Sequence, residues 1–228
     1  MNTKTKADWE SIAADLSIEG RAFIDGDYRD AASGATVASF SPHDGAEIAQ
    51  VAVCDETDAD RAVAAARAVF ERGDWSAMAP MERKKILVRW AEIIEQHAEE
   101  LAVLETLDVG KPIADTTGVD VPAAVRTIRW TGEAIDKVYG EISPTPNDTL
   151  ALIQRLPLGV IAAIVPWNFP PVDDCMEARP VTGDRQLGHR KTGTEHLADG
   201  ASHCGARPGG RITRGRPAGS ARQRFEAG

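Results

Sequence analysis

Apolar residues recur at two different spacings along the first 170 residues. The order Phe23-Ile24-Asp25-Gly26-Asp27-Tyr28 alternates around an Asp-Gly pair and predicts a small hairpin. Glu47 to Val53 predicts another short strand, and Leu150 to Arg155 alternates in the same way. Gly159 to Val165 is continuously apolar, which is typical of a strand buried on both faces.

Between these strands the apolar residues return at helical spacing. The first helix is expected to begin at Thr57 as its cap, with Asp58 and Asp60 near the positive end of the helix dipole. Gly73 to Ser76 should end it. Its predicted apolar face consists of Ala62, Val63, Ala66, Val69 and Phe70.

Two further helices are predicted. Pro80 suits the first turn of a helix of roughly 25 residues, which Asp108 to Pro112 should end. A third helix begins near Pro122. The long helix is expected to bury Ile86, Leu87, Trp90, Ile93, Ile94, His97, Leu101 and Leu104, and the third to bury Val125, Ile128, Ile135 and Val138. Helices flanking a buried strand indicate an α/β domain.

Charge divides the chain into two parts. Residues 1–177 carry 16 Lys and Arg against 31 Asp and Glu, whereas residues 178–228 carry 10 against 4. The acidic part disfavours nucleic acid or a membrane surface as its partner. The Arg- and Gly-rich tail has few apolar groups to offset the entropy of ordering, so we expect it to be disordered.

The cysteines and the beginning of the chain favour a cytoplasmic protein. Cys54, Cys175 and Cys204 form an odd, sparse set that gives no disulfide framework. Met1 to Lys4 does not start a signal peptide, and no stretch approaches the length of a membrane span. Cys54 is expected to lie on an early strand as a small core residue.

Three motifs together resemble a known family. Leu107 to Pro112 reads Leu-Asp-Val-Gly-Lys-Pro, Pro157 to Val160 reads Pro-Leu-Gly-Val, and Val165 to Pro170 reads Val-Pro-Trp-Asn-Phe-Pro. They are similar to the N-terminal part of the NAD(P)-dependent aldehyde dehydrogenase superfamily, from about Ile18 to Pro170. The implied fold is an incomplete Rossmann-like cofactor domain with an oligomerisation arm at about residues 140–156.

The resemblance implies a mechanism and its site residues. A cysteine thiolate attacks the aldehyde, hydride leaves to NAD or NADP, and a water activated by a glutamate releases the acid. Asn168 matches the family's side-chain donor to the oxyanion. Ile164, Val165, Pro166 and Trp167 match the wall along which the cofactor lies. Standing alone, Asn168 would be interpreted as a turn residue, and Asp108 and Lys111 as the end of a helix.

Two further segments of the sequence narrow the substrate class that the resemblance implies. Phe70 to Ser76 and Glu133 to Glu141 are similar to the branch that acts on γ-glutamyl-γ-aminobutyraldehyde in polyamine catabolism. The betaine-aldehyde and general aliphatic dehydrogenases are near relatives. The resemblance therefore implies a small-molecule aldehyde substrate and a homo-oligomer, without nucleic acid, membrane or metal.

Beyond Pro170 the chain departs from the family. The family's nucleophilic cysteine and its glutamate base lie further downstream than Gly228, and Cys175 follows Asn168 too closely to be that nucleophile. The codons can also be read one base later, so that each takes the last two bases of one printed codon and the first base of the next. In that frame Met176-Glu177 must encode Trp. Gly183 to Gly193 permit the sequence that the resemblance implies there, Ala-Thr-Gly-Asn-Ser-Val-Ile-Val-Lys-Pro-Ala. Val181 does not permit the expected alanine. We infer a one-base frameshift near the codons of Pro170 and Pro171.

The tail leaves two alternatives. His189, His196, His203 and Cys204 are metal-binding types, but only His203 and Cys204 are close enough for a usual zinc pair. Arg207 to Arg224 resembles a nucleic-acid segment without the interleaved aromatic residues. The sequence supports a zinc site and a nucleic-acid segment less well than it supports a disordered tail.

The expected organisation is a partial cofactor-binding domain over residues 1–170 and a frameshifted, disordered tail over 171–228. The expected function is oxidation of an amine-derived aldehyde by the ancestral enzyme, in a truncated and inactive version. The alternative is a non-catalytic fragment that associates with partner chains through the arm or aggregates. The missing strands of such a sheet would leave open edges.

Overall fold

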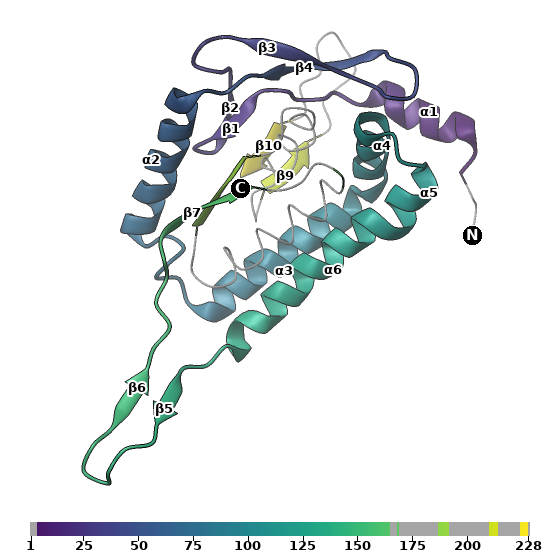
Figure 1. Ribbon diagram of the computed structural model, residues 1–228. Helices are drawn as coiled ribbons and strands as arrows, with labels where there is room; N and C mark the ends of the chain where they lie inside the picture. Colours follow the sequence, from purple (N-terminus) through teal and green to yellow (C-terminus); the bar gives the residue numbers. More distant parts are fainter. Residues whose placement is uncertain (1–3, 165–167, 169–186, 192–209, 214–223, 228) are drawn as a thin grey trace.

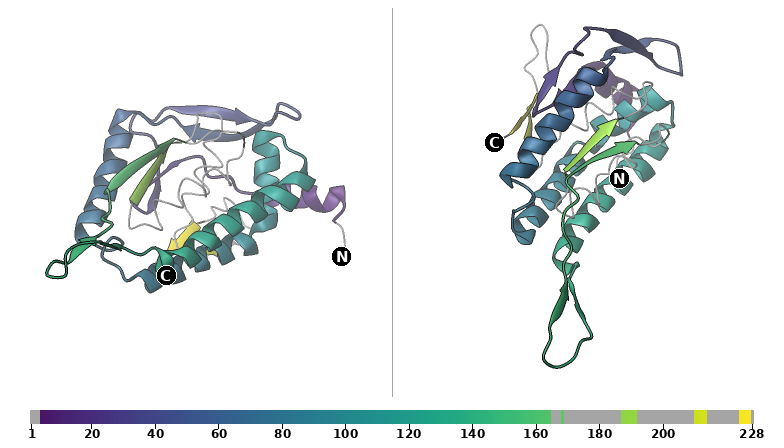
Figure 2. Two further views of the ribbon diagram at one scale, coloured as in Figure 1. Left: turned by 60° about the horizontal axis from the view of Figure 1, so that its bottom comes forward. Right: turned by 60° about the vertical axis from the view of Figure 1, so that its left-hand side comes forward.

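The computed structural model describes residues 4–164, 168, 187–191, 210–213 and 224–227. Two long helices lie side by side along one side of the molecule, and the β3–β4 hairpin crosses the opposite side (Figure 1). The β5–β6 hairpin projects away from this body as an arm, as both further views confirm (Figure 2).

The helices and turns are α1 (Lys6–Asp15), α2 (Glu56–Arg72), α3 (Pro80–Gln96), α4 (Ala98–Val109), α5 (Ile113–Asp115), a π-helical turn η1 (Thr116–Asp120), α6 (Val121–Ala134) and a 3-10 turn η2 (Ile135–Lys137). The strands are β1 (Ala22–Ile24), β2 (Asp27–Arg29), β3 (Thr36–Phe40), β4 (Glu47–Ala52), β5 (Glu141–Ser143), β6 (Ala151–Ile153), β7 (Val160–Ile164), β8 (Leu187–Lys191), β9 (Gly210–Thr213) and β10 (Arg224–Ala227). Within the described residues each strand pairs with a single neighbour, and only β7 and β8 run parallel.

The first hairpin is confirmed where the Asp-Gly pair predicted it. Strands β1 and β2 pair antiparallel with Phe23 opposite Tyr28, and the two rings meet edge to face at 5.2 Å between centroids. Asp25 and Gly26 both have positive φ, 55° and 82°. Two successive left-handed residues match the twist of the strands, which is why Asp-Gly is favoured in such a turn.

Helix α2 begins two residues earlier than the sequence analysis expected. The cap is Asp55, whose carboxylate accepts hydrogen bonds from the backbone of Thr57 and Asp58, while the Asp58 carboxylate accepts one from Asp55. Thr57 as the cap is therefore wrong. The Asp58 carboxylate also accepts from the backbone N–H of Ala32, at 3.0 Å to each oxygen, which ties a distant loop to the beginning of the helix.

The predicted long helix is in fact two helices. His97 has φ −106° and ψ 19°, and its backbone donates to the carbonyls of Ile93 and Ile94, which ends α3 before α4 begins at Ala98. Apolar residues continue on both sides of this break, because both helices face the core. No glycine or proline marks the break, so periodicity alone predicted a single helix.

The core lies mainly between α3 and α6. Its buried residues are Leu87, Ala91, Ile94, Ala102, Val121, Ala124, Val125, Ile128 and Ile135. Gly132 permits the close approach of the two helices, since a Cβ there would lie 3.0 Å from the Cβ of Leu87. Val138, predicted to be buried with this set, is 55% exposed because α6 and η2 have ended before it.

The end of α4 is held by polar contacts, which confirms the structural interpretation of Asp108 and Lys111. Gly110 adopts φ 79° and ends the helix, and the Ser39 hydroxyl donates to Asp108 at 3.0 Å. The Lys111 ammonium donates to Glu105 at 2.8 Å and to Asp120 at 2.7 Å. Both carboxylates are buried. Sequence reasoning did not identify Glu105 or Asp120 as partners of this lysine.

Three short strands fall within the predicted tail. Strand β8 pairs with β7, and β9 pairs antiparallel with β10. Most of residues 171–228 lie outside the described residues, as do Cys175, Cys204, His196 and His203, so the disordered tail and its boundary at 170 stay predictions. Among the described residues no helix is long and apolar enough to cross a membrane.

The Lys111 cluster gives the first testable prediction. Lys111→Met leaves two buried carboxylates without their cation and should lower the free energy of unfolding by about 3 to 5 kcal/mol. Lys85→Met is the matched control, because Lys85 pairs with Glu82 on the surface and should change stability little. Urea unfolding followed by circular dichroism measures both variants, and equal effects would contradict a role for burial.

The same cluster sets a pH dependence. Burial alone would lower the pKa of Lys111, but hydrogen bonds from its ammonium to Asp120 and Glu105 outweigh burial and raise that pKa above the ordinary 10.5. The stabilisation is therefore fully present below the ordinary lysine pKa and is lost as pH rises through the raised folded value. Lys111→Met should show a smaller loss of stability over that alkaline range than the unaltered chain.

Candidate functional site

The candidate site lies at the carboxyl end of β7. Strands β7 and β8 are parallel in register from Val160 opposite Leu187 to Ile164 opposite Lys191. In open α/β sheets, ligands bind outside the carboxyl ends of such strands. The two strands therefore present one edge, with Ile164 and Lys191 as its register positions, to any bound molecule.

Gly159 sets the direction in which the chain enters β7. Its φ is 101°, a conformation that side chains with a Cβ rarely adopt. A Cβ there would lie 3.2 Å from an Arg67 guanidinium nitrogen and 3.9 Å from the ring of Phe70. Helix α2 therefore lies against the beginning of β7, close to Gly159.

The expectation that β7 is buried on both faces is wrong for its second half. Val160 and Ile161 are half-buried, whereas Ala162 is exposed and Ile164 is 83% exposed. Within the described residues, α2 contacts the strand and only β8 runs beside it. The described part of the chain therefore leaves the apolar second half of β7 partly uncovered.

Asn168, the predicted oxyanion donor, is exposed and lies in a bend shortly after the end of β7. Of the predicted cofactor wall, Ile164 is described, and Val165, Pro166 and Trp167 lie outside the described residues. Ile164 is an exposed apolar side chain at the carboxyl edge of this parallel pair, and its contact with a cofactor stays a prediction. The role of Asn168 stays a prediction.

Cys54 is not the core residue that the sequence analysis expected. It lies two residues past the end of β4, in the connection to Asp55, and is exposed. Partial burial of the sulfur, followed by the negative charges of Asp58 and Asp55, raises the pKa of its thiol. Such a thiol is mainly protonated at neutral pH and is a poor nucleophile. No group of three or more metal-binding side chains gathers within the described residues.

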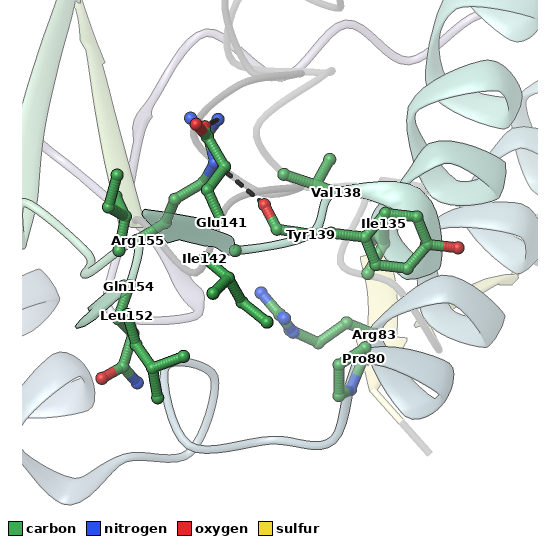
Figure 3. Close-up of a pocket in the computed structure, with 12 residues that line it drawn as sticks. Pro80, Arg83, Ile135, Val138, Tyr139, Glu141, Ile142, Leu152, Gln154 and Arg155 are labelled. Carbon is green, nitrogen blue, oxygen red and sulfur yellow. Dashed lines mark hydrogen bonds and ion pairs between the residues drawn. The ribbon is translucent and has the colours of Figure 1, made fainter. Parts of the chain in front are cut away.

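A hollow lies at the base of the arm (Figure 3). It has a volume of about 530 Å³ and lies between the first turn of α3, with Pro80 and Arg83, and the arm residues Ile142 and Leu152. Arg155 joins the two strands of the arm there: its guanidinium donates to the carbonyl of Tyr139 at 3.3 Å and to Glu141 at 3.4 Å. This hollow forms part of the arm, and Asn168 does not line it.

Comparison with protein families gives the identity of the fold. The model of the aldehyde dehydrogenase family matches residues 28–178, which include β7 and Asn168. The chain belongs to the aldehyde dehydrogenase family. Its described part matches the N-terminal part of that fold, as the three motifs implied.

Among curated relatives, the chain is 51% identical over 180 residues to the NADP/NAD-dependent aldehyde dehydrogenase PuuC of Escherichia coli, covering 79% of this chain and 36% of PuuC. It is 47% identical over 166 residues to the aminoacetaldehyde dehydrogenase of Pseudomonas aeruginosa, covering 73% and 34%. The chain thus spans about a third of the length of these relatives.

Solved structures agree. An indole-3-acetaldehyde dehydrogenase of P. syringae, solved with NAD+, superposes with a TM-score of 0.87 at 50% identity, covering 89% of this chain and 41% of the other. The γ-glutamyl-γ-aminobutyraldehyde dehydrogenase of Burkholderia cenocepacia gives 0.84 at 45% identity, covering 90% and 43%. The cofactor class of the family, NAD or NADP, follows from these relatives.

The second testable prediction concerns the start of β7. Gly159→Ala forces a Cβ into the left-handed region and should destabilise the protein by about 1 to 2 kcal/mol. Gly118→Ala is the matched control, because Gly118 lies in η1, where an added Cβ would meet nothing within 4 Å, and should be neutral or slightly stabilising. Thermal unfolding followed by circular dichroism compares them. An unchanged melting temperature in Gly159→Ala would contradict the strain.

Proposed function

We propose that this chain derives from an NAD(P)-dependent enzyme that oxidises an amine-derived aldehyde, such as γ-glutamyl-γ-aminobutyraldehyde, to the carboxylic acid. The observation that carries the proposal is the 51% identity to PuuC across 180 residues. Relatives named for aminoacetaldehyde and for γ-glutamyl-γ-aminobutyraldehyde support the substrate class. The sparse, odd set of cysteines supports a cytoplasmic place of action.

In this proposal the last residue of β7 and the residues that follow it have two roles. Ile164, Val165, Pro166 and Trp167 hold the dinucleotide, which accepts hydride from the substrate. The Asn168 amide donates a hydrogen bond to the substrate oxygen as negative charge develops on it. A donor fixed where charge develops stabilises the transition state more than the ground state, and so accelerates the reaction.

The chain as printed is proposed to be inactive. The thioester mechanism needs a cysteine thiolate, and the only described cysteine, Cys54, has a raised thiol pKa and lies on another part of the fold. Cys175 is too close to Asn168 in sequence for the role. We attribute the departure from the family after Pro170 to a frameshift, which removes the nucleophile and the glutamate base from this reading.

A chimera tests the proposed function. Residues 1–170 of this chain, joined to the remaining part of PuuC, should oxidise γ-glutamyl-γ-aminobutyraldehyde with NAD, and Asn168→Ala in that chimera should lower kcat by about 100- to 1,000-fold. Asn147→Ala at the tip of the arm is the control and should leave kcat unchanged. NADH formation measures all three proteins.

The unmodified 228-residue chain should give no NADH in that assay. NADH formation whose rate rises in proportion to the concentration of this chain, and that is absent in its Asn168→Ala variant, would refute the proposed inactivity. A chimera that folds, binds NAD and oxidises other aldehydes but not the γ-glutamyl substrate would refute the substrate class alone.

A second function, association through the arm, is favoured by a separate observation. Ile142 and Leu152 face each other across the β5–β6 pair and are 72% and 67% exposed. Leu150 and Leu156 are exposed to a similar degree. A two-stranded hairpin is marginal by itself, and its open edges and apolar side chains favour pairing with another chain.

Association gives its own prediction. The double variant Ile142→Glu, Leu152→Glu places charges on the exposed apolar pair and should weaken self-association by about tenfold or more, which corresponds to about 1.4 kcal/mol. Asn147→Glu adds a charge at the polar tip and is the matched control. Sedimentation velocity over a concentration series measures both. A chain that stays monomeric before substitution would contradict this function.

A further inference from the structure

Strand β8 has a sequence that does not suit its place. It lies parallel to β7, in a register of five residue pairs from Val160 and Leu187 to Ile164 and Lys191. Parallel strands in α/β proteins are near-continuous runs of Val, Ile and Leu. Leu187 to Lys191 reads Leu-Gly-His-Arg-Lys, with one large apolar residue and three polar ones. Its partner β7 reads Val-Ile-Ala-Ala-Ile.

The misfit begins at a definite point of the chain. The family model ends at residue 178, close to where the balance of charge changes from acidic to basic. Upstream of that point, sequence pattern and structure agree in β1 and β2, in the beginning of α3 at Pro80 and in the beginning of α6 beside Pro122. A change of reading frame that affects only the later residues would explain both the change of charge and the unsuitable sequence of β8.

We infer that the DNA encoding residues 171–228 contains, one base later, the apolar strand that belongs beside β7. Each shifted codon takes two bases from one codon and the first base of the next. At position 189 it must encode Ile or Thr, both β-branched, whichever codons His189 and Arg190 use. At position 191 it must encode Lys or Arg. At positions 188 and 190 it permits Val.

The same shift applied to β7 is a built-in control. Shifted codons across Val160 to Ile164 permit only Leu, Ser, Pro, Gln, Arg or a stop, so none of the five positions can encode a β-branched residue. A β-branched strand in the shifted frame is therefore not a general result of shifting apolar codons. At the segment that the structure pairs with β7, the shifted frame requires a β-branched residue at position 189 and permits one at positions 188 and 190.

The direction of the shift follows from the same codons. Family-like codons begin one base later than the printed ones, so the printed reading contains one base too many near the codons of Pro170 and Pro171. Removing that base makes Met176-Glu177 encode Trp followed by Lys or Arg. This inference rests on the frameshift of the proposed function and deepens it, because it states what the shifted codons encode beside β7.

The experiment is to sequence the encoding DNA from the codon of Val165 to that of Gly228. The expected result is a shifted frame without stop codons that encodes Val or Ala at positions 188 and 190 and Leu or Ser at 187. A fresh sequence that lacks the extra base and reads this strand directly supports the inference equally. A stop codon in the shifted frame, or Asp, Glu or Gly at positions 188 and 190, overturns it.

Failure here is distinguishable from failure of the proposed function. The DNA readout depends on the third bases of the codons for Leu187, Gly188 and Arg190, whereas the chimera assay depends only on residues 1–170. An active chimera with a shifted frame full of stops would retain the function and reject the coding inference. An inactive chimera with an open, apolar shifted frame would do the reverse.

Discussion

The packing of α3 against α6 is the interaction on which the rest of the described structure depends. Leu87 and Ala91 on one helix and Val125 and Ile128 on the other belong to one buried cluster, and Gly132 lets the two helices approach closely. The two helices direct both ends of the described body. One end leads through η1 to the buried cluster around Lys111, and the other leads through η2 into the arm (Figure 1).

The two ends of this helix pair differ in chemistry. At the Lys111 end, the buried charges are compensated by each other. The hydrogen-bond geometry of Lys111 with Glu105 and Asp120 holds that part of the chain, and burial of apolar surface does not. At the arm, apolar side chains are exposed on a hairpin that has no third strand among the described residues. The first arrangement is complete within the described chain, whereas the second is suited to a partner.

Sequence reasoning predicted the elements whose signals are local. Asp25-Gly26, Pro80 and Gly110 act through backbone conformation, and each is where it was expected. It failed at the cap of α2, where Asp55 has the place expected for Thr57, and at the break at His97, which no residue type marks. Periodicity also reports which side chains are apolar and not what covers them, so the exposure of Val138 and Ile164 was not predictable. At the site, the motif predicted Asn168 at the carboxyl end of β7, but no local signal linked Glu105 and Asp120 to Lys111.

Strand β7 connects the fold to the function. Its first residues are held by α2 through the close approach at Gly159, and its carboxyl end leads to Asn168. A strand held at one end directs the residues that follow it only if neighbours on the sheet fix its plane, since an amide that rotates freely cannot be preorganised toward a developing charge. The neighbour present is β8, whose Gly188 and His189 lack the β-branched side chains that pack well in a parallel sheet. The unsuitable neighbour and the proposed loss of catalysis would therefore have one origin, because both concern residues that follow Pro170.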